Sequence, residues 1–269
     1  YILEVYRGLA TNSLPNEAFL ELARIQLSGS GHPVTAAADR RIPSQDEIDL
    51  RYRRCVTSRS LGNARVGIAA IEADLDGHPV HTKGLIDLLD GVNGSTNYSV
   101  DFYGYINITD IPEQLTLLMM AGYSSFDITE DMTQSLKTFL SRGGVIFGES
   151  CVKKSDDTQD SGGFKESFND LAVFLDRQLV PVENGHPVLS SLHKFSSPPA
   201  GVRGTDMMVS GDGMFFNDCD YGCLWEAGVS GDHGSRELIR STVELGVNVV
   251  VYSHQRALDN RLTSERTQL

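Results

Sequence analysis

The chain has 269 residues, 40% of them hydrophobic, and carries a formal net charge of −13 from 36 acidic and 23 basic residues. This acidic balance repels phosphate backbones and anionic membranes, so we expect no nucleic-acid partner. No apolar run approaches the roughly 18 residues that a bilayer span requires, so no membrane-spanning segment is expected. The four cysteines are too few for a disulfide framework in a chain of this length, and they leave the cellular compartment open.

The first sixty residues differ in character from the rest of the chain. Tyr1–Tyr6 predicts an edge strand, and Ser13 with Pro15 predicts the start of a helix. Residues 32–59 are polar and rich in arginine, which favours an arm or loop packed on the main domain. We therefore expect a small helical or irregular extension over residues 1–60, either a solvated connector or an arm that binds a partner.

The clearest pattern lies in the middle of the chain. Leu115–Ala121 is a short, unbroken apolar run, which predicts a strand covered on both faces. Thr129–Arg142 has apolar residues at helical spacing, and Gly143 is placed to end that helix before a second strand at Val145–Phe147. A right-handed crossover makes the two strands parallel, so the residues that follow them lie at one carboxyl edge, where ligands usually bind.

Other segments extend this alternation of strands and helices. Further strands are expected at Arg65–Asp74, Asp101–Thr109, Leu179–Glu183 and Val247–Tyr252, with a hairpin over Met207–Asp218. Further helices are expected at Leu85–Gly91, Phe164–Gln178 and Ser235–Leu245, with Gly91 and Gly246 as stops. Residues 153–163 predict a polar loop, and residues 257–269 a loose tail. The sequence thus predicts an α/β three-layer sandwich with a mostly parallel sheet over residues 61–256.

Three blocks within this region resemble a known family. They read "LLMMAGYSSFDIT…LKTFLSRGGVIFGESC", "ENGHPVLSSLHKF" and "FFNDCDYGCLWEAG…STVELGVNVVVYSH". In this order, over about residues 65–256, they resemble the bacterial domain-of-unknown-function family numbered 4159. The resemblance implies a class I glutamine amidotransferase-like, flavodoxin-like sheet and an exported protein. The chain departs from the family pattern at Glu149, Ser150 and Cys151, which stand where the family carries two acids after the fourth strand.

A hydrolase-like site is one interpretation of this departure. If the strand before Ser150 matches the one that precedes the amidotransferase nucleophile, Ser150 takes the nucleophile position and Cys151 follows it. A nucleophile also needs a base and an orienting acid, and His186 and His254 are the candidate bases. Val152 stands where the nucleophile turn favours a small residue, and no His-x-Glu pair follows the last block. A structural serine and a buried free cysteine are therefore the favoured interpretation.

Acidic and aromatic residues near the same edge predict a ligand-binding site. Glu149, Asp220, Trp225 and Glu226 are its candidate residues, because a tryptophan beside a carboxylate often holds sugar or peptide ligands. The alternative is that Trp225 closes the core with its N–H group hydrogen-bonded.

Metal binding is a weaker prediction. Asp74, Asp76, His78 and His81 offer carboxylates and imidazoles that suit a divalent cation, although a turn with side-chain hydrogen bonds explains the same sequence. Cys219 and Cys223 are spaced to pair in an oxidising compartment, whereas a metal site there would need two more thiols or histidines nearby. We commit to no metal and expect no cofactor.

Three sequons begin at Asn93, Asn97 and Asn107, and they are candidate glycosylation sites only if the protein is exported to a surface. The sequence begins at Tyr1, which fits a removed signal peptide or a start that is not included. We expect an extracytoplasmic location, with the cytoplasm as the alternative.

Two hypotheses about function follow. The first is a non-catalytic binding or scaffold protein of an exported or cell-surface assembly, with protein partners or self-association and room for a small-molecule or carbohydrate ligand. The second is a hydrolase-like enzyme that uses Ser150 or Cys151 with a histidine base.

Overall fold

The computed structural model describes residues 23–29, 31–52, 61–151, 162–203, 208–230 and 234–267. The strands of its main sheet are β3 (Gly62–Ala69), β4 (Tyr98–Ile106), β5 (Leu117–Gly122), β6 (Val145–Ser150), β7 (Val180–Pro181), β8 (Val209–Gly211) and β9 (Met214–Asn217). They lie in the order β4-β3-β5-β6-β9-β8-β7. The first five in this order run parallel, and β8 pairs antiparallel with both β9 and β7.

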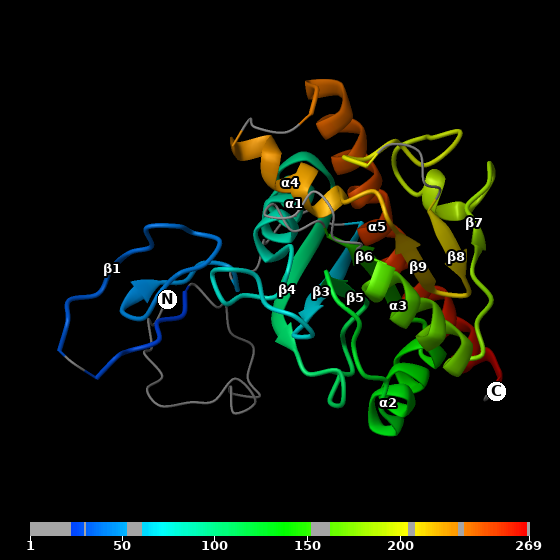
Figure 1. Cartoon of the computed structure of the whole chain (residues 1–269), viewed down its shortest axis with the longest axis horizontal. Coiled ribbons are helices and arrows are strands. Elements are labelled where there is room, and N and C mark those ends of the chain that lie inside the picture. The colour runs from blue at the N-terminus through cyan, green and yellow to red at the C-terminus, as the bar shows by residue number, and fades with distance from the viewer. Residues whose placement is uncertain are drawn as a thin grey trace.

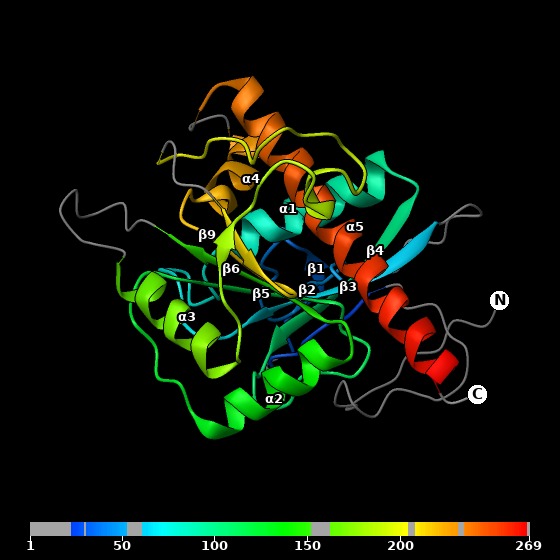
Figure 2. The same cartoon turned by 90° about the vertical axis from the view of Figure 1, so that its right-hand side faces the viewer.

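Helices cover both faces of this sheet (Figures 1 and 2). Helices α1 (Thr82–Ser95), α4 (Tyr221–Ser230) and α5 (Arg236–Thr267) pack on one face, and α2 (Glu130–Ser141) and α3 (Gly162–Phe174) pack on the other. The predicted three-layer α/β sandwich with a mostly parallel sheet is therefore confirmed. The described helices include none long and apolar enough to cross a membrane.

Strand β5 shows why a continuous apolar run is needed at the centre of the sheet. Its side chains alternate between two separate cores, because successive residues of a strand point to opposite faces. Leu117, Met119 and Ala121 belong to the core under α1, α4 and α5. Leu118 and Met120 belong to the core under α2 and α3. A strand buried on both sides cannot show the polar alternation of a surface strand.

The strand order places the switch point of the sheet beside β3, at the position where ligands usually bind in open parallel sheets. Chain order runs outward from β3 to β4 on one side and to β5 and β6 on the other, which is the flavodoxin-like arrangement with its switch point between β3 and β5. The carboxylate of Glu72, just after β3, accepts hydrogen bonds there from the backbone N–H groups of Tyr123 and Ser124 at 2.7 and 3.0 Å. The chain's own carboxylate therefore occupies these amide donors.

Most of the predicted elements are confirmed with small changes in their bounds. The helix α2 begins after Thr129, whose side chain accepts from Met132 N at 3.2 Å, and ends before Gly143 with φ 88°. The hairpin between β8 and β9 turns at Asp212 and Gly213, both with positive φ. The short strand expected at Leu179–Glu183 is β7.

The strand predicted at Val247–Tyr252 is wrong, because this segment lies inside the 32-residue helix α5. Gly246 does not stop the helix. A Cβ atom at this position would lie 2.8 Å from Leu88 and 3.0 Å from Trp225, so glycine lets α5 approach α1 and α4 closely. The valine-rich run is apolar because it faces the core, and burial overrides the strand preference of β-branched residues.

Two helix ends also differ from expectation. Helix α1 continues through Gly91 to Ser95, and Gly91 does not adopt the left-handed backbone that would end the helix. The expected loose tail is wrong as far as Thr267, since residues 257–267 are the last part of α5. The strand at Tyr1–Tyr6, the helix start at Ser13 and most of the loop at 153–163 lie outside the described residues.

The described part of the N-terminal extension forms an arm beside the sheet, at the left of Figure 1. It holds a small parallel pair, β1 (Thr35–Ala36) with β2 (Glu47–Ile48). Two arginines tie the arm to the main domain. Arg41 lies 3.3 Å from Asp87 of α1, and Arg51 donates to the Tyr105 hydroxyl of β4 at 3.3 Å.

Asn248 gives a test of how the middle of α5 is held against the loop at Leu192 and His193. Its Oδ1 accepts from the N–H groups of Leu192 and His193 at 3.0 and 2.7 Å, and its Nδ2 donates to His193 O at 2.8 Å. We expect Asn248→Ala to lower the free energy of unfolding by about 2–3 kcal/mol, because it removes three hydrogen bonds from a buried side chain. The measurement is urea unfolding, with Asn260→Ala on the same helix as a control that costs less than about 1 kcal/mol. Equal effects of both substitutions would contradict the role of this contact.

Candidate functional site

Glu149 is a buried carboxylate at the carboxyl edge of the sheet, and three hydrogen bonds hold it in place. It is the penultimate residue of β6, and its side chain is fully buried. Its carboxylate accepts hydrogen bonds from Asn217 Nδ2 at 2.7 Å, Tyr221 N at 2.6 Å and Gly222 N at 2.9 Å. The last two are the first amides of α4, so the carboxylate satisfies helix donors that have no partner within the helix.

His81 lies between this carboxylate and a second one. Its Nδ1 is 2.7 Å from Glu149 Oε2, and its Nε2 is 3.0 Å from Asp220 Oδ1. Burial lowers the pKa of His81, but the charges of Glu149 and Asp220 outweigh burial and raise this pKa well above its ordinary value of 6.5. The imidazole therefore lies between two buried carboxylates, an arrangement that favours its charged form.

Two glycines allow these groups to come together. A Cβ atom at Gly222 would lie 2.3 Å from the His81 ring, and one at Gly84 would lie 2.1 Å from the carbonyl oxygen of Gly222. Such distances are forbidden, so the starts of α1 and α4 can meet only where both residues lack a side chain. His81 and Asp220 themselves have φ of 66° and 60°, which is uncommon for residues other than glycine.

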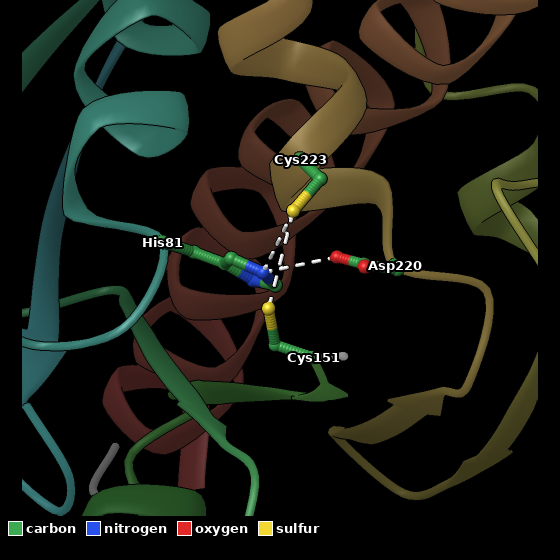
Figure 3. Close-up of side chains that lie close together, drawn as sticks. All are labelled: His81, Cys151, Asp220 and Cys223. Carbon is green, nitrogen blue, oxygen red and sulfur yellow. Dashed lines mark hydrogen bonds and ion pairs between the residues drawn. The ribbon is translucent and has the colours of Figure 1, made fainter. Parts of the chain in front are cut away.

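Two thiols complete the group, as Figure 3 shows. Cys223 Sγ lies 3.8 Å from His81 Nε2 and 3.9 Å from Cys151 Sγ. The hydrogen bond with Cys151 and burial raise the pKa of the Cys223 thiol, and His81 opposes them only in part. We call His81, Glu149, Cys151, Asp220 and Cys223 the buried cluster. Four of these residues, all except Glu149, place potential metal-ligating atoms within 4.8 Å of one another.

The predicted nucleophile and its candidate bases are not brought together. Ser150 is fully buried, and its hydroxyl makes no hydrogen bond to any residue that the structure describes. His186 instead accepts from Val188 N at 3.2 Å and lies against the ring of Phe215. His254 lies 3.2 Å from the backbone oxygen of Asn63. The histidine beside Cys151 and Cys223 is His81, which we considered above only as a metal ligand.

Among the predicted ligand-binding residues, Trp225 is a core side chain. It is 4% exposed, its Nε1 donates to Thr242 O at 3.0 Å, and its ring packs near Phe147. This arrangement leaves no free ring face for a ligand and matches the alternative interpretation. Glu226 lies apart from the buried cluster, with a side chain 40% exposed and 3.9 Å from Arg41.

The loop after β3 separates the four predicted metal candidates. Asp74 Oδ1 accepts from the N–H groups of Asp76 and His78, which is the side-chain-stabilised turn. Asp76 pairs with Lys83, and His78 contacts the hydroxyl of Tyr105. Of the four candidates, His81 alone joins the buried cluster.

The three sequons differ in their exposure. Asn93 lies in α1 and its side chain is hydrogen-bonded to the backbone of Val100 in both directions. Asn97 and Asn107 are exposed. Glycosylation itself stays a prediction.

Sequence reasoning missed the role of Cys223, which it paired only with Cys219. Cys219 is buried outside the group of metal-ligating atoms. The available signal was the short spacing of the two residues, since Asp220 directly precedes α4 and Cys223 lies in its first turn.

Glu149 is the group on which the cluster depends, and its charge is testable. We expect Glu149→Gln to lower the free energy of unfolding by about 3–5 kcal/mol, because it removes one partner of a buried ion pair and turns an amide N–H₂ toward other donors. The measurement is guanidinium unfolding at neutral pH. Glu226→Gln is the matched control and should cost less than about 1 kcal/mol, since its ion pair is exposed. A loss below about 1 kcal/mol for Glu149→Gln would contradict this role.

Comparisons with known proteins give a family and a distant structural likeness. No curated protein matches the sequence. A crystal structure of a protein described as ThuA-like, from Bacteroides uniformis, is 14% identical, with a TM-score of 0.38 over 74% of this chain and 93% of that chain. A likeness at this TM-score carries no argument about function. The model of the family "Domain of unknown function (DUF4159)" matches residues 81–253, which include all five residues of the buried cluster. The chain therefore belongs to the DUF4159 family.

Proposed function

We propose that this protein is a non-catalytic binding or scaffold protein of an exported or cell-surface assembly. The observation that carries the proposal is the state of Ser150, which is fully buried and makes no hydrogen bond to a described residue. An active serine must be hydrogen-bonded to a base and must reach the substrate. Neither condition is met at this position, and Cys151 beside it is only 4% exposed.

The ligand crevice at the switch point supports the same proposal. The backbone N–H groups of Tyr123 and Ser124 point to the position where related sheets bind anionic ligands, and Glu72 already accepts their hydrogen bonds. An anionic substrate would have to displace this carboxylate. The edge therefore favours structural hydrogen bonds over substrate binding.

The arm offers surface for a partner. Ile25, Leu27, Val34 and Leu50 are large apolar residues of the arm, and they are 44%, 62%, 44% and 47% exposed. Exposed apolar side chains concentrated in one short segment favour protein contacts or self-association. This supports an arm that docks on another protein over a solvated connector.

A cysteine hydrolase is the second candidate, and one contact chain favours it. Cys223 Sγ lies 3.8 Å from His81 Nε2, and His81 Nδ1 lies 2.7 Å from Glu149, which is the order of thiol, base and acid. Two features weigh against it. The pKa of Cys223 is raised rather than lowered, and Asp220 shares the same imidazole nitrogen.

Chemical labelling distinguishes the two candidates. The native protein is treated with a fluorophosphonate and, separately, with iodoacetamide, beside a heat-denatured sample, and labelled peptides are located by mass spectrometry. We expect no fluorophosphonate on Ser150. We expect Cys151 and Cys223 to react with iodoacetamide much faster after denaturation, because Cys151 is buried and Cys223 is half-buried with a raised thiol pKa.

The deciding control is His81→Ala. Selective native labelling of Cys223 that His81→Ala abolishes would establish an activated thiol and reject the non-catalytic proposal. Native labelling of Ser150 that His186→Ala or His254→Ala abolishes would reject it as well.

A further inference from the structure

Four side chains with metal-binding atoms converge from three separate segments of the chain. His81 precedes α1, Cys151 follows β6, Asp220 follows β9, and Cys223 lies in the first turn of α4. Figure 3 shows their imidazole, thiol and carboxylate groups pointing toward one another. His81, Cys151 and Asp220 are 8%, 4% and 2% exposed, so the meeting point is inside the protein.

The geometry points to a structural zinc site formed by His81 Nε2, Cys151 Sγ, Asp220 and Cys223 Sγ. In a tetrahedral zinc site with bonds of about 2.0–2.3 Å, neighbouring ligand atoms lie roughly 3.3–3.8 Å apart. The two sulfur atoms are 3.9 Å apart, and Cys223 Sγ is 3.8 Å from His81 Nε2. His81 Nε2 and Asp220 Oδ1 are 3.0 Å apart. These separations need only small movements to fit one ion.

Glu149 supplies the outer support that such sites require. A metal-bound histidine almost always has its second ring nitrogen on a carboxylate, a carbonyl or water, which fixes the ring and its tautomer. Glu149 Oε2 lies 2.7 Å from His81 Nδ1, and the amides of Tyr221 and Gly222 hold this carboxylate in place. His81 Nε2 is thereby turned toward the two thiols and Asp220.

The donor set selects the class of metal. Two thiols with an imidazole and one carboxylate favour Zn²⁺ over Mg²⁺ or Ca²⁺, which prefer oxygen ligands only. Four protein ligands fill a tetrahedral shell, so no position stays open for water or substrate. The ion would tie β6, α1 and α4 together, which is a structural role and does not rest on the proposed binding function.

Metal binding by the reduced, full-length protein is the direct test. The protein is stripped with a chelator, titrated with Zn²⁺ and with Co²⁺ under exclusion of oxygen, and its metal content is measured by mass spectrometry. We expect one equivalent of Zn²⁺, a higher Tm with Zn²⁺, and a Co²⁺ complex with the visible bands of tetrahedral coordination and a thiolate charge-transfer band. The absence of stoichiometric binding, or a Co²⁺ spectrum without thiolate bands, would overturn the site.

Single thiol variants locate the ligands. Cys151→Ser and Cys223→Ser should each weaken Zn²⁺ binding by more than about 100-fold, because outer-shell changes alone cost about 10–100-fold. Cys219→Ala is the matched control, since Cys219 is a buried thiol outside the four ligands and its loss should leave the affinity unchanged. Full affinity in either serine variant would overturn the assignment, and the Co²⁺ spectrum of the wild-type protein tests the site even where a variant fails to fold.

Oxidation is the competing chemistry of the two thiols. Cys151 and Cys223 are close enough to form a disulfide after a small shift, with loss of two protons and two electrons to an oxidant. Intact mass after alkylation, measured before the titration, shows which form is isolated. A Cys151–Cys223 disulfide that, once reduced, yields protein unable to bind Zn²⁺ would replace the metal site with a disulfide.

Discussion

The buried carboxylate of Glu149 is the interaction on which the carboxyl edge depends. It joins the end of β6 to Asn217 of β9, to the first amides of α4 and to His81 before α1. A charged carboxylate away from water is costly unless donors and an opposite charge surround it. Here helix donors, a side-chain amide and the imidazole of His81 surround it together, so four segments of the chain must be positioned at once.

The fold could be predicted where the pattern is local. The strand–helix–strand unit around α2 is fixed by a continuous apolar run, an amphipathic stretch and Gly143, all within a few turns of one another. The end of the chain could not be predicted this way, because Val247–Tyr252 has the composition of a strand and a glycine before it. This segment is part of a helix that packs on Leu88 and Trp225, which are distant in sequence. Gly246 allows the close approach of the helices. Local secondary-structure propensity does not predict such contacts.

The candidate site was predictable in part, and the missing part is again non-local. The parallel sheet brings residues after β6 and β9 to one edge, so Glu149 and Asp220 were expected to be neighbours. His81 follows a long loop after β3, and the sequence of that loop does not determine the direction of the His81 side chain. Gly222 leaves room for the imidazole ring, and Glu149 and Asp220 lie at its two nitrogens. The amidotransferase pattern places the base after the nucleophile in the sequence, whereas His81 precedes both cysteines of the cluster.

At the same edge, the protein's own carboxylates accept hydrogen bonds from backbone amides after β5 and at the start of α4. Catalytic sites on parallel sheets use free amides near strand ends and helix N-termini to bind substrate anions and developing negative charge. In this chain, Glu72 takes the amides after β5, and Glu149 takes the first amides of α4. Both anion-binding positions are therefore filled by the protein's own carboxylates. These hydrogen bonds hold the strands and helices together, which supports the structural role that we propose for the buried cluster.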